Sequence, residues 1–133
     1  MSAFSNYLED QITGWIAGTT FASAPTATFV QLYNGDPTDT GSSGTALYSR
    51  VSVASGAGSW TRGTGGNGTI TNASAITITS SATATASATY VAVFDASGAG
   101  ANLLFYGALT TAKTIASGDE VKFNASALTL TVA

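Results

Sequence analysis

Apolar residues in the first part of the chain recur at helical spacing. The repeat is formed by Phe4, Leu8, Ile12, Trp15 and Ile16. Residues at this spacing lie on one face of an α-helix, so the pattern is typical of an amphipathic helix. Ser2 offers an N-cap oxygen, and Gly18 fits the position just after a helix end. We expect a helix over residues 2–18, which either covers one end of the protein's own core or docks on a partner.

After Pro25 the pattern changes to an alternation of period two, which is typical of β-strands. Val30 and Leu32, for example, alternate with Phe29 and Gln31. Strands are expected at 28–33, 47–54, 60–62, 69–79, 82–94, 103–109, 121–124 and 128–132. Seven to eight short strands separated by Gly-, Ser- and Asn-containing turns predict a mainly β fold. The expected architecture is an antiparallel β-sandwich over 26–133 with a short N-terminal amphipathic helix.

The chain has 133 residues, a length that one hydrophobic core can serve, so we expect a single domain over 1–133. No apolar stretch approaches the roughly 20 residues that a membrane-spanning helix needs. The first residues also lack the basic start of a secretory signal, because no Lys or Arg precedes Arg50. We expect synthesis in a cytoplasm and no contact with a membrane.

Histidine and cysteine are both absent from the chain. These residues supply most general bases, nucleophiles and soft metal ligands, so their absence argues against an enzyme. Asp119 and Glu120 are adjacent and would point to opposite faces of a strand, unlike a catalytic carboxylate pair. Around Pro37, Asp36 and Asp39 favour an aspartate-stabilised turn over a calcium site. No catalytic, cofactor-binding or metal-binding residue is predicted.

Charged residues are unusually few. They make up 8% of the chain, with a net charge of −3 and a sequence pI near 4.3. Nucleic acid is not an expected partner, because phosphate neutralisation requires clustered Lys and Arg. A surface with so little charge repels its neighbours weakly, which favours a place in an assembly over a free monomer.

Several short segments resemble a family of small virion structural proteins of tailed bacteriophages, whose members include capsid cement or decoration proteins and so-called tail fibre proteins. The resemblance is carried by Ser2–Glu9, Ala24–Thr26, Tyr48 and Arg50, Phe94–Ala96, Asn102–Leu104, Tyr106–Leu109 and Gly118–Asp119. The chain departs from the family pattern at Ala92–Val93, where Gly-Ile is expected, and at Ser126, where glycine is expected. The resemblance implies a virion structural role and carries over no catalytic residue.

The first function that we expect from this resemblance is that of a capsid cement protein. Such a protein would lie on the capsid surface, oligomerise as a homotrimer and clamp adjacent subunits of the major capsid protein. The sandwich edges and the apolar helix face would supply many weak contacts that add up around a symmetry axis. The candidate contact residues of the helical region are Phe4, Leu8, Trp15 and Phe21.

The alternative function is a tail-fibre or adhesin module that contacts a glycan or protein on the host surface. Loops 36–44 and 56–68 would form the contact surface. The candidate stacking and charged groups are Tyr48, Trp60 and Arg62, because exposed aromatic and guanidinium groups often serve this role.

Overall fold

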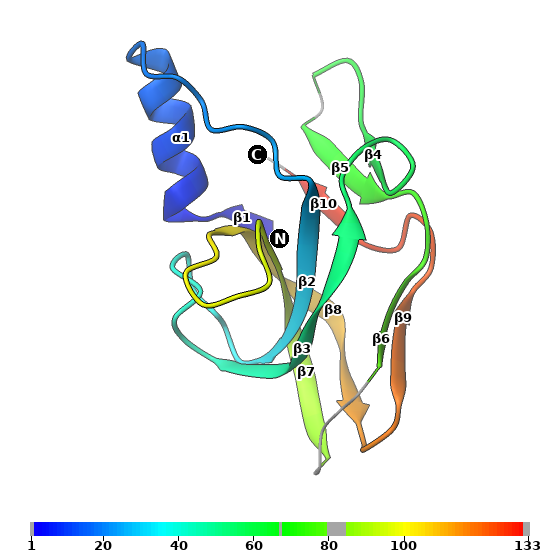
Figure 1. Ribbon diagram of the computed structural model, residues 1–133. Coiled ribbons are helices and arrows are strands. Elements are labelled where there is room, and N and C mark those ends of the chain that lie inside the picture. The colour runs from blue at the N-terminus through cyan, green and yellow to red at the C-terminus, as the bar shows by residue number, and fades with distance from the viewer. Residues whose placement is uncertain (1, 67, 80–84, 132–133) are drawn as a thin grey trace.

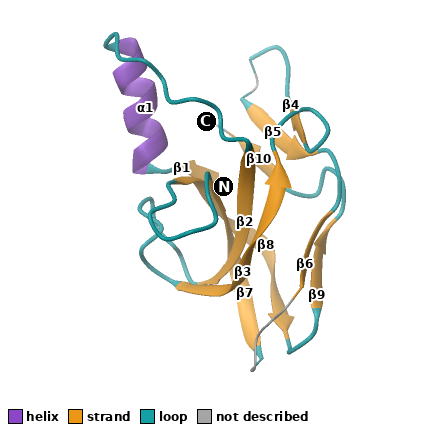
Figure 2. Cartoon of the chain, in the orientation of Figure 1, coloured by secondary structure: helices purple, strands orange, loops and turns teal. Residues whose placement is uncertain are grey.

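The computed structural model describes residues 2–66, 68–79 and 85–131. Within these ranges the chain forms one helix and ten strands (Figures 1 and 2). Their bounds are β1 Ser2–Phe4, α1 Asn6–Ile16, β2 Ala27–Asn34, β3 Thr45–Ala54, β4 Trp60–Arg62, β5 Thr69–Asn72, β6 Ile76–Thr79, β7 Ala86–Phe94, β8 Leu103–Ile115, β9 Glu120–Phe123 and β10 Thr129–Thr131. The described helix is neither long nor apolar enough to cross a membrane.

The strands pack as two layers (Figure 1). One layer is a five-stranded sheet in the order β1-β8-β7-β2-β3. The other consists of the three-stranded sheet β10-β5-β4 and the pair β6-β9. All described strand pairs are antiparallel. The predicted fold class, a mainly β antiparallel sandwich with an N-terminal helix, is confirmed.

The main core lies between the two layers. Its buried members come from both sides and include Leu32 of β2, Val93 of β7, Ile78 of β6 and Leu130 of β10. In β6 the predicted alternation holds, because Ile76 and Ile78 are buried while the threonines between and after them are exposed. A smaller cluster on the outer face of the five-stranded sheet contains Tyr33, Ala92, Phe94 and Leu103.

The segment predicted as one strand over 69–79 is two strands, because Asn72 ends β5. This side chain is fully buried and replaces part of the missing strand pairing. Its Nδ2 donates to the carbonyls of Ser74 (2.8 Å) and Asn124 (2.8 Å), and its Oδ1 accepts from the Leu128 N–H (2.8 Å). Asn72 therefore joins the β5–β6 break to the chain between β9 and β10.

The N-terminal helix is shorter than predicted. Residues Ser2–Phe4 pair with β8 as strand β1, so Phe4 is not a helix residue and Ser2 is not the N-cap. Ser5 takes the N-cap position, and its Oγ accepts from the Leu8 N–H (3.2 Å). Gly18 follows the helix end with a left-handed backbone (φ 91°), as expected for a helix stop.

The strand predicted over 103–109 is longer in the structure. β8 continues to Ile115, beyond the predicted end at residue 109, and pairs with the first part of β7. Residues 82–84 of the predicted 82–94 strand and residue 132 of the last predicted strand lie outside the described residues.

Candidate interaction surfaces

Helix α1 is fixed to the sandwich at its N-terminal end. The Ser5 N–H donates to the Leu104 carbonyl (3.1 Å), and the Ser5 hydroxyl donates to the Leu103 carbonyl. The Asn6 N–H donates to the Asp39 carbonyl (3.2 Å), which lies in the loop between β2 and β3. Buried Ser5 thus caps the helix and ties it to β8 at the same time.

The C-terminal end of α1 projects from the sandwich (Figure 1). None of the helix residues is buried. Trp15 is 64% exposed, Ile16 is 74% exposed, and Phe21, just beyond the helix, is 42% exposed. We call these three residues the α1 tip. They are the exposed large hydrophobic residues of the part of the chain that the structure describes.

Two further contacts hold the α1 tip in shape. The Thr19 N–H donates to the Gly14 carbonyl (2.8 Å), which closes the turn after the helix. The Ala22 N–H donates to Oε1 of Gln11 (2.8 Å), which ties the returning segment to the helix. The tip is therefore an ordered apolar surface, and its components need little rearrangement on binding.

Tyr48 and Arg50, which carry part of the family resemblance, lie at an irregularity of strand β3. The pairing with β2 shifts between Val30 and Leu32, and Tyr48 adopts a left-handed backbone (φ 64°). Nε2 of Gln31 donates to the Tyr48 carbonyl (2.8 Å), while Nε of Arg50 donates to Oε1 of Gln31 (3.0 Å). The bulge turns Arg50 toward the outer face of the five-stranded sheet.

There the Arg50 guanidinium holds the loop that follows β7. It stacks over the Phe94 ring, 3.6 Å from the centroid, and Nη1 donates to the carbonyls of Ala96 and Gly98 (3.0 Å each). In the same loop, the Asp95 carboxylate accepts from the N–H (2.7 Å) and Nδ2 (2.7 Å) of Asn102. Arg50, Asp95 and Asn102 all belong to segments that carry the family resemblance, and together they shape the loop between β7 and β8.

Burial raises the pKa of Tyr33 above its usual value of 10.0, and the nearby Arg50 guanidinium partly opposes this shift. Burial also raises the pKa of Tyr106, and the negative charges of Asp36, Asp39 and Glu9 add to the effect, together with Tyr90. Carboxylates of α1 and of the β2–β3 loop are thus close enough to Tyr106 to raise its pKa.

In the β2–β3 loop, Oδ1 of Asp36 accepts from the Thr38 N–H (2.8 Å), which confirms the predicted aspartate-stabilised turn.

The residues predicted for host contact do not form a common surface. Trp60 is only 8% exposed, and its Nε1 donates to Oγ1 of Thr28 (3.0 Å), so the expectation of an exposed stacking aromatic is wrong. Tyr48 is half-buried, and its hydroxyl is buried without a hydrogen-bond partner among the described residues. Arg62 is exposed on β4.

Of the contact residues predicted in the helical region, Trp15 and Phe21 meet at the α1 tip, whereas Leu8 and Phe4 lie half-buried nearer the sandwich.

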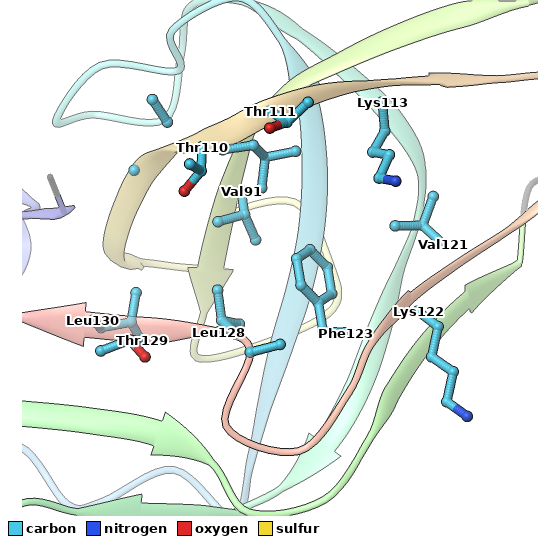
Figure 3. A pocket seen from close by; sticks show the side chains of 14 residues that line it. Val91, Thr110, Thr111, Lys113, Val121, Lys122, Phe123, Leu128, Thr129 and Leu130 are labelled. Atoms are coloured by element: carbon cyan, nitrogen blue, oxygen red, sulfur yellow. The ribbon is translucent and has the colours of Figure 1, made fainter.

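A second surface, which the sequence did not indicate, is an open groove between the layers (Figure 3). We call it the β8 groove. It has a volume of about 360 Å³ and lies between β8 and the segment that runs from β9 to β10. Apolar side chains that line it include Val91, Leu109, Val121, Phe123, Leu128 and Leu130. In Figure 3, Lys113 extends toward Val121 at the side of the groove, whereas Lys122 points away from it.

These features define a small β-sandwich protein with a projecting helix that ends in an exposed apolar tip. The family model described as "Podophage GP4 fiber I protein gp80" matches residues 3–131, and the chain belongs to this family. It is therefore a structural protein of a tailed-phage virion, in agreement with the resemblance noted in the sequence. No curated protein matches the chain. Of the two virion functions considered from the sequence, the family favours the tail fibre over the capsid cement.

Proposed function

We propose that this protein is a non-catalytic subunit of a phage tail fibre and that it joins its neighbour in the fibre through the α1 tip. The observation that carries the proposal is the state of α1, a helix with no buried residue that ends in Trp15, Ile16 and Phe21, all exposed. The family description, a fibre protein, supports the location. The lack of histidine and cysteine supports a role in binding.

The energetic argument concerns the stability of α1. An isolated helix of 11 residues is marginal in water, and most helices in proteins are stabilised by packing of their apolar face. Here the backbone at the start of the helix is bonded to the sandwich, and Tyr7 and Leu8 line a hollow together with Leu104 and Phe105. Apolar surface removed from water contributes roughly 25 cal/mol per Å², so a partner that covers Trp15 and Ile16 would stabilise both the helix and the complex.

The anchoring of the helix supports a binding role for the tip. Ser5 and Asn6 fix the start of α1, and Gln11 holds the returning segment. A surface that is already ordered loses little conformational entropy when it binds. Large exposed aromatic residues in such a position are typical centres of protein interfaces.

The test is incorporation of a variant into the virion. In the phage that encodes the protein, W15S/I16S should fold but should be lost from purified particles, because the variant lacks the apolar contact. Thr13→Ser, an exposed change on the same helix that keeps the hydroxyl group, is the matched control and should be incorporated normally. Quantitative mass spectrometry of the particles gives the copy number, and circular dichroism of the purified protein checks the fold. Wild-type incorporation of W15S/I16S would contradict the proposal.

A further inference from the structure

The β8 groove and the α1 tip have complementary chemistry. The groove is lined by apolar side chains and three threonines, Lys113 lies at its side, and no Asp or Glu is among its lining residues. The tip is apolar, and α1 carries Glu9 and Asp10 but no basic residue. Glu9 lies two helical turns before Ile16, on the same side of the helix. A partly apolar groove with a lysine at its side thus matches an apolar helix tip with an acidic flank.

The charged groups at both surfaces are available for a partner. No ion pair of Glu9, Asp10 or Lys113 occurs within the described residues. Lys113 is exposed, and its side chain extends toward Val121 at the side of the groove in Figure 3. Opposite charges across an interface would fix the orientation of the partner and increase the rate of association.

The groove also borders an open strand edge. β1 pairs with β8 only at Phe105–Gly107, although β8 continues to Ile115. Along this edge the five-stranded sheet has no further described strand. Natural proteins usually cover or modify such edges, so the exposed part of β8 is a favourable place for another chain.

The α1 tip of a chain does not reach its own groove. Hydrogen bonds of Ser5 and Asn6 hold the start of the helix beside Leu103, Leu104 and Asp39. From there α1 extends away from β9, as Figure 1 shows. The two complementary surfaces therefore belong to one chain but can meet only between two chains.

Building on the proposed function, we propose that the partner of the α1 tip is a second copy of this chain, which receives the tip in its β8 groove. Because the tip and the groove are different surfaces, the contact is head-to-tail. Repetition of such a contact produces either a closed ring or an extended filament. The low charge of the chain favours this association, since like copies repel one another weakly.

The experiment uses two variants of the full chain, each damaged at one surface. W15S/I16S loses the tip and keeps the groove. T110E/K113E changes two exposed residues that line the groove, which places carboxylates opposite Glu9, and keeps the tip. Wild type should self-associate in analytical ultracentrifugation, and each variant alone should associate at least about thirtyfold more weakly, as expected for the loss of central contacts. Circular dichroism checks that both variants are folded.

A mixture of the two variants gives the decisive result. Each retains the surface that the other lacks, so the mixture should form a one-to-one dimer and no larger species. The charge exchange E9K/K113E provides a second check, because it should restore part of the association that Lys113→Glu alone removes. A mixture that stays monomeric, or a T110E/K113E variant that associates as strongly as wild type, would overturn the head-to-tail contact.

The same variants separate this inference from the proposed function. If W15S/I16S is lost from virions while T110E/K113E is incorporated at the wild-type level, the tip binds a different virion protein. In that case the inference about a second copy fails and the proposed function stands. If W15S/I16S is incorporated normally, the proposed function itself fails.

Discussion

At the scale of single residues, Arg50 shows how a family-like position acts through structure. Its guanidinium contacts the Phe94 ring, the carbonyls of Ala96 and Gly98, and the side chain of Gln31. The sequence drew attention to Tyr48 and Arg50 as a pair, but it assigned Tyr48 to host contact. The structure places the pair at a β-bulge, where both residues are half-buried and Arg50 is engaged in holding a loop.

The first prediction concerns Arg50→Lys. A lysine keeps the charge but cannot donate in the same planar arrangement or stack in the same way. We expect the free energy of unfolding to fall by about 1–2 kcal/mol. The loop of residues 95–101 should also become more sensitive to proteases. The control is Arg62→Lys, an exposed change that should alter neither property. Equal stability of the two variants in urea denaturation would contradict the role assigned to Arg50.

The second prediction concerns alkaline pH. The pKa of Tyr33 and of Tyr106 is raised in the folded protein, chiefly by burial. The folded state therefore holds the phenolic protons more tightly than the unfolded state. This contribution to stability is complete below the ordinary pKa of 10.0 and is lost as the pH rises through the folded pKa. The free energy of unfolding should begin to decline once the pH exceeds the ordinary pKa of 10.0, and Tyr106→Phe should make this decline less steep. An identical decline in wild type and variant would exclude Tyr106 as a contributor.

At the scale of elements, local patterns predicted some features and missed others for identifiable reasons. The helical spacing of Leu8, Ile12 and Trp15 correctly indicated α1, because helical periodicity is a local property. The predicted start of the helix was wrong. Ser2–Phe4 forms a strand because it pairs with residues 105–107, and this long-range pairing leaves no local signal in the sequence. The burial of Trp60 was missed for a similar reason, since its Nε1 partner, Thr28, lies far away in the sequence.

The third prediction concerns the break between β5 and β6. Alternating residues over 69–79 gave no sign of it, whereas the structure shows that buried Asn72 satisfies three backbone groups at this point. Asn72→Ala would leave those groups without their partner in a buried region. We expect the free energy of unfolding to fall by about 3 kcal/mol. Asn124→Ala, at an exposed position nearby, should change it by less than about 0.5 kcal/mol. Similar urea midpoints for both variants would refute the role of Asn72.

At the scale of the whole molecule, the sandwich was predictable because alternation and turn spacing are repeated along the chain. The α1 tip was partly predictable, since Trp15 and Phe21 stood out as large apolar residues near a short helix. The β8 groove was not predictable, because it forms where residues of β7, β8, β9 and the approach to β10 meet. None of these segments carries a local signal for a groove.

The central claim is that this chain is a fibre subunit whose α1 tip is covered by a neighbouring subunit. The most direct test is a cryo-electron microscopy map of the intact phage at a resolution that shows side chains. The account predicts that the protein lies in a tail fibre, with Trp15 and Ile16 buried against another chain. A protein found on the capsid shell, or a fibre in which the α1 tip faces solvent, would contradict it.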